Sequence, residues 1–180
     1  MAARPTPKPL DMVKAMVVLL IPVILAWAWF SRVPDGPTIT PVDWQTVATT
    51  ARAESPYPIL TPENLPNTWV ATRVHWYKIG KLGLDGQAVP GNTWQLGFLS
   101  PEKIFIALDQ RDAETATLIK QVTKGGTSDG AVTIAGRTWT RYDSPDGHTK
   151  ALVLTEPPVV SAVSGDTSYE GLAAFASTLR

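Results

Sequence analysis

The chain combines an apolar run near its start with a long segment in which polar and apolar residues alternate. Residues 15–30, AMVVLLIPVILAWAWF, contain no charged side chain. As a helix this run is about 24 Å long, and it reaches about 28 Å if residues 12–14 are included. Because these lengths approach the roughly 30 Å hydrocarbon core of a bilayer, the pattern predicts one transmembrane helix over 15–30.

Flanking residues predict how this helix lies in a membrane. Trp27, Trp29 and Phe30 cluster at its end, where aromatic rings favour the headgroup region or contact other membrane helices. Residues 1–14 carry three basic side chains and the terminal amine, whereas only Arg32 follows the run closely. This bias predicts a cytoplasmic N-terminus, a cell-membrane location and an extracytoplasmic C-terminal domain.

Two other interpretations of the apolar run are open. The tripeptide Ala26-Trp27-Ala28 has the form of a signal-peptide cleavage site, and cleavage after Ala28 would release the domain. The bulky aromatic residues around that site argue against cleavage. A buried core helix is the third interpretation, but no polar residue gives the run a face toward water.

Residues 31–40 predict a stiff, proline-bearing linker, and residues 41–180 predict one folded domain. A helix is expected to begin with Thr40 as its N-cap and Pro41 at its first position. It should end before Ser55-Pro56, because a residue preceding proline avoids helical angles. The segment PYPILTPENLP then predicts an extended crossing, since its prolines prevent regular strand pairing.

From Trp69 onward the apolar period becomes two, which is typical of strands. Trp69 and Trp76 are expected on opposite faces of the first strand. A hairpin loop is expected at 78–92 and a flexible loop at 123–130. Helices are expected at 113–122 and, at the end of the chain, after a capping box that begins at Thr167. The seven expected strands are 69–77, 94–99, 103–108, 131–134, 137–142, 150–154 and 159–164. Short, turn-linked strands favour an α+β fold, in which helices flank an antiparallel sheet.

Composition narrows the possible functions. Residues 31–180 carry 13 Lys and Arg against 15 Asp and Glu, a near-neutral balance that gives no support for nucleic-acid binding. The chain contains no cysteine, which excludes disulfides, thiolate metal sites, cysteine nucleophiles and an anchor on a lipidated cysteine.

No residue pattern indicates catalysis or a cofactor. His75 and His148 lack the spacing of a metal site. Ser144 and Asp146 lie close to His148 in sequence, but no Gly-x-Ser-x-Gly elbow accompanies them. The glycine-bearing segment 80–83 lacks the spacing of a phosphate-binding loop. We therefore predict a protein that is not an enzyme and has no cofactor, metal or catalytic residue.

Aromatic residues supply the predicted contact surface. Five of the seven tryptophans lie in the domain, where packing of the core is their main expected role. Unless helices cover both sheet faces, one ring of the first strand is exposed. The predicted partner-contact surface of the domain therefore consists of His75, Trp76, Tyr77 and the loop that follows them, because exposed aromatic side chains are preferred at protein contacts.

Several short motifs, in their order along the chain, resemble a known family. They are Val42-Asp43-Trp44, Pro56-Tyr57-Pro58-Ile59-Leu60, Leu65-Pro66, Trp69, Trp94-Gln95-Leu96-Gly97-Phe98-Leu99, the segment 136–142 around Trp139, and the closing helix at 165–179. Over nearly its whole length the chain resembles the actinobacterial domain-of-unknown-function family 4245. This resemblance implies an envelope-facing domain with a fold similar to the Mog1/PsbP type and an accessory or assembly role. It supplies no catalytic residues.

These observations predict a single-pass membrane protein that serves as a non-catalytic accessory or assembly subunit of a larger envelope complex. The predicted partners are the lipid bilayer and integral membrane protein subunits, with a respiratory supercomplex of the cytochrome bc–oxidase type as an example. The alternative is an extracytoplasmic domain that binds an envelope lipid or small molecule. A solid core with an exposed aromatic strand favours the first function, and a sizeable apolar cavity favours the second.

Overall fold

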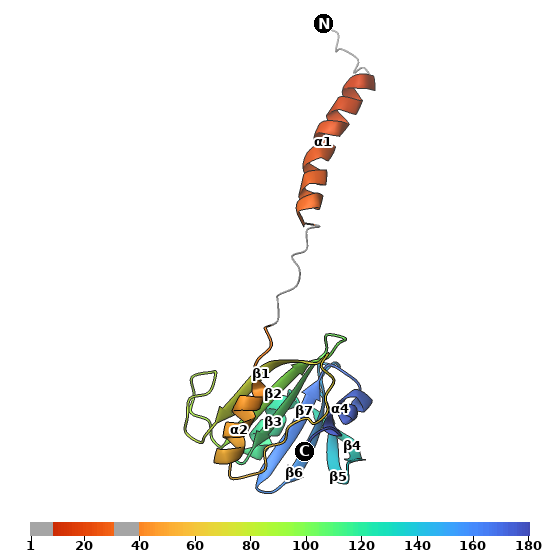
Figure 1. Ribbon diagram of the computed structural model, residues 1–180. Coiled ribbons are helices and arrows are strands. Elements are labelled where there is room, and N and C mark those ends of the chain that lie inside the picture. Colours follow the sequence, from red (N-terminus) through yellow and green to blue (C-terminus); the bar gives the residue numbers. More distant parts are fainter. Residues whose placement is uncertain (1–8, 31–39) are drawn as a thin grey trace. The chain divides into compact units, whose positions relative to one another are not determined.

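The computed structural model describes residues 9–30 and 40–180, which belong to two separate compact units. In the first unit, helix α1 (Pro9–Phe30; Figure 1) contains the predicted apolar run. Its described side chains are exposed. No helix, as far as its residues are described, is long and apolar enough to cross a membrane. Residues 1–8 of the predicted cytoplasmic segment and residues 31–39 of the predicted linker lie outside the described residues.

In the second unit, residues 40–180 form a seven-stranded antiparallel sheet with helices, which confirms the predicted α+β class. The strand order is β1-β2-β3-β7-β6-β5-β4, so that β1 and β4 are the two edges (Figure 1). In chain order the elements are α2 (Trp44–Glu54), β1 (Val70–Tyr77), β2 (Thr93–Leu99), β3 (Phe105–Arg111), α3 (Thr115–Val122), β4 (Thr127–Ile134), β5 (Arg137–Asp143), β6 (Lys150–Glu156), β7 (Val159–Gly165) and α4 (Tyr169–Ala176).

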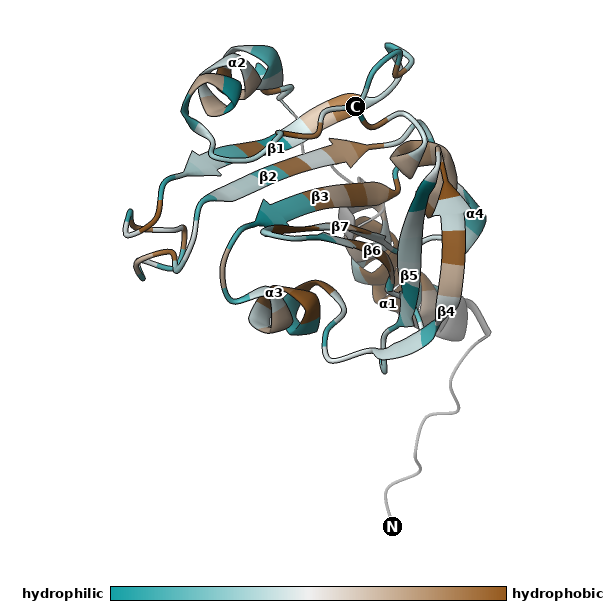
Figure 2. Ribbon diagram, turned by 90° about the horizontal axis from the view of Figure 1, so that it is seen from below, coloured by the Kyte–Doolittle hydropathy of each residue, from teal (hydrophilic) through white to brown (hydrophobic). Residues whose placement is uncertain are grey.

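Helices pack on both faces of this sheet and create two separate cores. The larger core joins one face to α2, α4 and the crossing segment between α2 and β1, and Trp94 and Trp139 are buried in it. The smaller core joins the other face to α3, where Leu118 packs against Val153 and Val160. Figure 2 shows α2 and α3 on opposite sides of the strands. Because α3 is only two turns long, it covers part of its face and leaves the rest open.

The crossing segment is held by side chains instead of by strand pairing. The Gln110 side chain, buried on β3, accepts a hydrogen bond from the backbone nitrogen of Leu60 at 2.7 Å. Its amide nitrogen donates to the Ser161 hydroxyl at 3.0 Å. Trp94 donates from Nε1 to the Leu60 carbonyl at 3.0 Å. Since prolines deny this segment a regular ladder, these bonds satisfy backbone groups that burial would otherwise leave unpaired.

A β-bulge overturns the prediction that Trp69 and Trp76 lie on opposite faces. The pairing of β1 with β2 shifts by one position between Ala71 and Arg73, which leaves Thr72 as an extra residue. The extra residue reverses the alternation, so both tryptophans pack against the larger core. Arg73 consequently lies on the opposite face, where α3 packs.

Several element boundaries also differ from the predictions, among them the start of α2 and the start of β4. Helix α2 begins at Trp44 with Asp43 as its N-cap, not with Thr40, because the backbone nitrogen of Val42 bonds to the Ala71 carbonyl at 3.0 Å. The flexible loop predicted at 123–130 is shorter, because β4 begins at Thr127. Most of β4 is exposed, so ladder hydrogen bonds and not an apolar pattern define its start.

Candidate functional site

The predicted membrane-interface residues lie at the end of α1. Trp27 is 72% exposed, and the side chains of Trp29 and Phe30 lie outside the described residues. Large apolar side chains are also exposed along the preceding turns, with Leu19 at 71%. The described part of α1 therefore presents an extended apolar surface, which a soluble protein rarely leaves uncovered.

The three predicted contact residues of β1 do not form one patch. His75 and Tyr77 share the face on which α3 packs, with their rings stacked at a centroid distance of 5.5 Å. Trp76 lies on the other face, against the ring of Tyr57, and donates from Nε1 to the Glu54 carboxylate at 3.0 Å. Burial and, second, the charge of Arg73 lower the pKa of His75 below its ordinary value.

The loop between β1 and β2, which was part of the predicted contact surface, exposes apolar side chains that the prediction did not name individually. Ile79, Leu82 and Leu84 are 64–73% exposed, the largest values among the big apolar side chains described in the domain. The sequence signal for this exposed surface was the presence of isoleucine and leucine beside glycines and lysines in a predicted loop. We call these three side chains the hairpin patch.

Backbone hydrogen bonds hold the hairpin patch in place. The backbone nitrogen of Gly80 donates to the Val89 carbonyl at 2.9 Å, and the backbone nitrogen of Val89 donates to the Lys81 carbonyl at 2.8 Å. The nitrogen of Gly83 donates to the Gln87 carbonyl at 2.8 Å. Because the loop is built around its own ladder, the apolar side chains point outward from an ordered hairpin.

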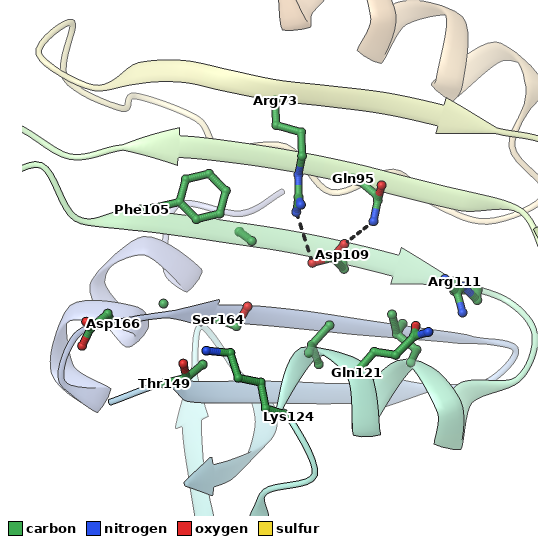
Figure 3. A pocket seen from close by; sticks show the side chains of 14 residues that line it. Arg73, Gln95, Phe105, Asp109, Arg111, Gln121, Lys124, Thr149, Ser164 and Asp166 are labelled. Atoms are coloured by element: carbon green, nitrogen blue, oxygen red, sulfur yellow. Dashed lines mark hydrogen bonds and ion pairs between the residues drawn. The ribbon is translucent and has the colours of Figure 1, made fainter. Parts of the chain in front are cut away.

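A second candidate site is a pocket of about 450 Å³ on the open part of the sheet face that carries α3. Strands β1, β2, β3 and β7 form its floor, and α3 forms one wall (Figure 3). Its lining mixes charged side chains with the apolar side chains of Phe105, Leu118 and Val122. We call this site the α3 pocket.

At the centre of the α3 pocket, Asp109 joins three strands. Its Oδ2 atom lies 3.6 Å from Arg73 Nη2 on β1, and its Oδ1 atom accepts a hydrogen bond from Gln95 Nε2 on β2 at 2.8 Å (Figure 3). The Arg73 guanidinium also lies over the ring of Phe105, 5.6 Å from its centroid. Asp109 thus fixes the arginine above the pocket floor.

Asp109 gives the fold a specific pH dependence. Burial raises the pKa of Asp109 above its ordinary value, against the opposing effects of Arg73, Gln95 and Arg111. Between the unfolded pKa of about 3.9 and the raised folded pKa, the folded state binds more protons, so Asp109 makes stability fall as pH rises. Relative to Asp109→Asn, which does not titrate, the wild type is expected to lose stability from about pH 4 upward. Urea unfolding of both proteins across pH measures this difference, and a pH-independent difference contradicts it.

Ser144, Asp146 and His148, which lie close together in the sequence, belong to one turn. The Asp146 carboxylate accepts hydrogen bonds from Lys124 Nζ at 2.7 Å and from the backbone nitrogens of His148 and Thr149. The Lys124 ammonium, with these backbone groups, holds the pKa of Asp146 well below its ordinary value. Within the same turn, the Ser144 hydroxyl accepts a hydrogen bond from the backbone nitrogen of Asp146 at 3.5 Å. Within residues 9–30 and 40–180, no group of three His, Cys, Asp or Glu side chains is arranged to hold a metal ion.

Sequence comparison places this fold in a family. No curated protein matches the chain, and no solved structure matches it. A family model described as "Protein of unknown function (DUF4245)" matches residues 4–179. Because this match covers nearly the whole chain, the protein belongs to the DUF4245 family.

Proposed function

We propose that this protein is a single-pass membrane protein whose extracytoplasmic domain is a non-catalytic accessory or assembly subunit of an envelope complex. The observation that carries the proposal is the exposed apolar surface of α1, from Met16 to Trp27. Water disfavours such a surface, whereas a bilayer or neighbouring membrane helices cover it. The basic residues before the run support a cytoplasmic N-terminus, and the aromatic residues near Ala28 support retention of the helix.

We assign the domain to the Mog1/PsbP type of architecture, supported by the helices that flank both faces of its antiparallel sheet. The partner in this proposal is an integral membrane protein of the envelope complex. A cytochrome bc–oxidase supercomplex is the first such assembly to test.

The hairpin patch is the contact surface that we propose for this partner. Ile79, Leu82 and Leu84 offer three outward apolar side chains on an ordered loop, and removal of such area from water stabilises an interface. Trp76 is less suitable than predicted, because its indole already packs against Tyr57 and bonds to Glu54.

Substitution of the hairpin patch is expected to break this contact. A photo-crosslinking residue at exposed Gln87 should capture one integral membrane protein in living cells. The triple variant Ile79→Ser, Leu82→Ser and Leu84→Ser should lower that adduct more than about tenfold, because each buried apolar side chain contributes on the order of 1 kcal/mol or more. Immunoblotting and mass spectrometry of the adduct measure the loss.

A conservative triple variant, Ile79→Val, Leu82→Met and Leu84→Met, is the matched control and should retain the adduct. The same crosslinker at exposed Thr138 of β5 controls for random collision. Equal adducts from Gln87 and Thr138, or an adduct unchanged by the serine variant, would show that the hairpin patch is not the contact surface.

A further inference from the structure

We infer that the α3 pocket is a binding site for a small molecule that carries a carboxylate or phosphate group on an apolar body. This inference is independent of the membrane anchor and of the hairpin patch. It rests on the charge balance of the pocket, on its apolar wall and on its size.

The charge balance leaves one buried cation without a salt bridge. Its charge acts on Asp109 only from beyond salt-bridge distance. The other carboxylate of the lining, Asp166, lies at the opposite end of the pocket (Figure 3). Arg111 is only 8% exposed at the end of β3, and its Nε donates to the Thr93 hydroxyl at 3.2 Å. Among the described side chains, no carboxylate oxygen forms a salt bridge with it within 4.0 Å. A buried guanidinium is costly unless it is paired, and a ligand oxyanion supplies that pair.

The other cations of the α3 pocket each have a carboxylate within salt-bridge distance. Arg73 faces Asp109 at 3.6 Å, and Lys124 bonds to Asp146 at 2.7 Å. One oxygen of Asp109 faces Arg73 and the other accepts a hydrogen bond from Gln95. Asp109 therefore does not form a salt bridge with Arg111 that a ligand anion would have to displace. Arg111 is therefore the group that gives the pocket its preference for an anion, since a planar guanidinium binds carboxylate and phosphate through paired hydrogen bonds.

The apolar wall defines the rest of the ligand. Phe105 of β3 is 41% exposed, and its ring lines the pocket beside the Arg73 side chain (Figure 3). Leu118 and Val122 of α3 line the same space. A volume of about 450 Å³ lies within the roughly 300–1,000 Å³ typical of small-molecule sites. An oxyanion alone would leave most of this volume and the apolar wall unused.

Titration calorimetry of the full-length protein in detergent tests the inference with water-soluble probes. Phenyl phosphate and benzoate present the two candidate oxyanions on the same apolar ring, so their relative affinities identify the preferred group. Inorganic phosphate lacks the ring, and benzyl alcohol lacks the charge. We expect at least one of the two anionic aromatic probes to bind more tightly than both of these controls.

Two variants locate the binding group. Arg111→Gln should weaken binding of the anionic probe about tenfold or more, because it removes the charged hydrogen-bond donor that pairs with the oxyanion. Gln121 of α3 extends toward Arg111 (Figure 3). Gln121→Glu should therefore also weaken binding of the probe, because a carboxylate at this position would pair with the arginine. Gln121 is exposed, so this second variant keeps the test valid if loss of the buried arginine prevents folding.

Gln45→Glu makes the same charge change on exposed α2, which packs on the other sheet face, and should leave binding unchanged. Three results would overturn the inference. They are no binding of either anionic aromatic probe, equal binding of benzyl alcohol, and binding that Gln121→Glu leaves intact. Inorganic phosphate that binds as tightly as phenyl phosphate would overturn the proposed apolar body.

Discussion

Two charges in the middle of α1 are expected to move the protein from the membrane fraction to the soluble fraction of the cell. In the variant Leu20→Asp and Ile24→Asp, each aspartate at the centre of a membrane helix costs about 2.5–3.5 kcal/mol. Each replaced apolar residue also removes a favourable contribution of roughly 0.3–0.6 kcal/mol. The combined loss is large compared with the hydrophobicity of a short run that already contains Pro22. Fractionation of cells followed by alkaline carbonate extraction measures the change.

The matched variant Leu20→Ala and Ile24→Ala should remain in the membrane fraction, because alanine adds no charge to the apolar run. N-terminal sequencing of the membrane-bound wild type should give a chain that still includes the residues before Ala28. A mature protein that begins after Ala28, or a wild type extracted by carbonate, is incompatible with a retained anchor.

Trp94→Ala is expected to remove a large part of the stability of the domain. The Trp94 side chain is fully buried in the larger core, so its truncation leaves a cavity that costs about 3–5 kcal/mol. The same change leaves the Leu60 carbonyl without its hydrogen-bond donor. Because a domain of this kind is stable by only about 5–15 kcal/mol, the variant should be close to unfolding. Urea unfolding monitored by circular dichroism gives the free energy.

Two companion variants separate the contributions to this effect. Trp94→Phe retains most of the packing and should lose mainly the hydrogen bond to Leu60, about 1 kcal/mol. Leu84→Ala, at a 73% exposed position of the hairpin patch, should change stability by less than about 0.5 kcal/mol. Equal destabilisation by Trp94→Ala and Leu84→Ala would mean that Trp94 does not support the core.

The sequence predicted most elements of the fold, because their apolar periods are local. Seven strands, the helix between the third and fourth of them and the closing helix all appear at the expected places. The bulge at Thr72 was not predicted, because an extra residue leaves no local mark in a strand of mixed polarity. That single residue decides which face receives Trp76 and which receives Arg73.

The α3 pocket was also beyond local sequence reasoning, because its charged side chains come from different strands. The predicted strand 103–108 stopped before the polar residues Asp109, Gln110 and Arg111, whereas β3 extends to Arg111. In the structure this polar end is buried, with Gln110 bonded to the crossing segment and Asp109 to Arg73. Such pairing depends on sheet order, which a pattern along one strand does not contain.

Purification of the full-length protein in mild detergent tests the central claim most directly. Size-exclusion chromatography with mass spectrometry should give a complex much larger than the 19.5 kDa chain, containing integral membrane proteins in a fixed ratio. A monomer without stable partners would contradict the assignment as a subunit of an envelope complex.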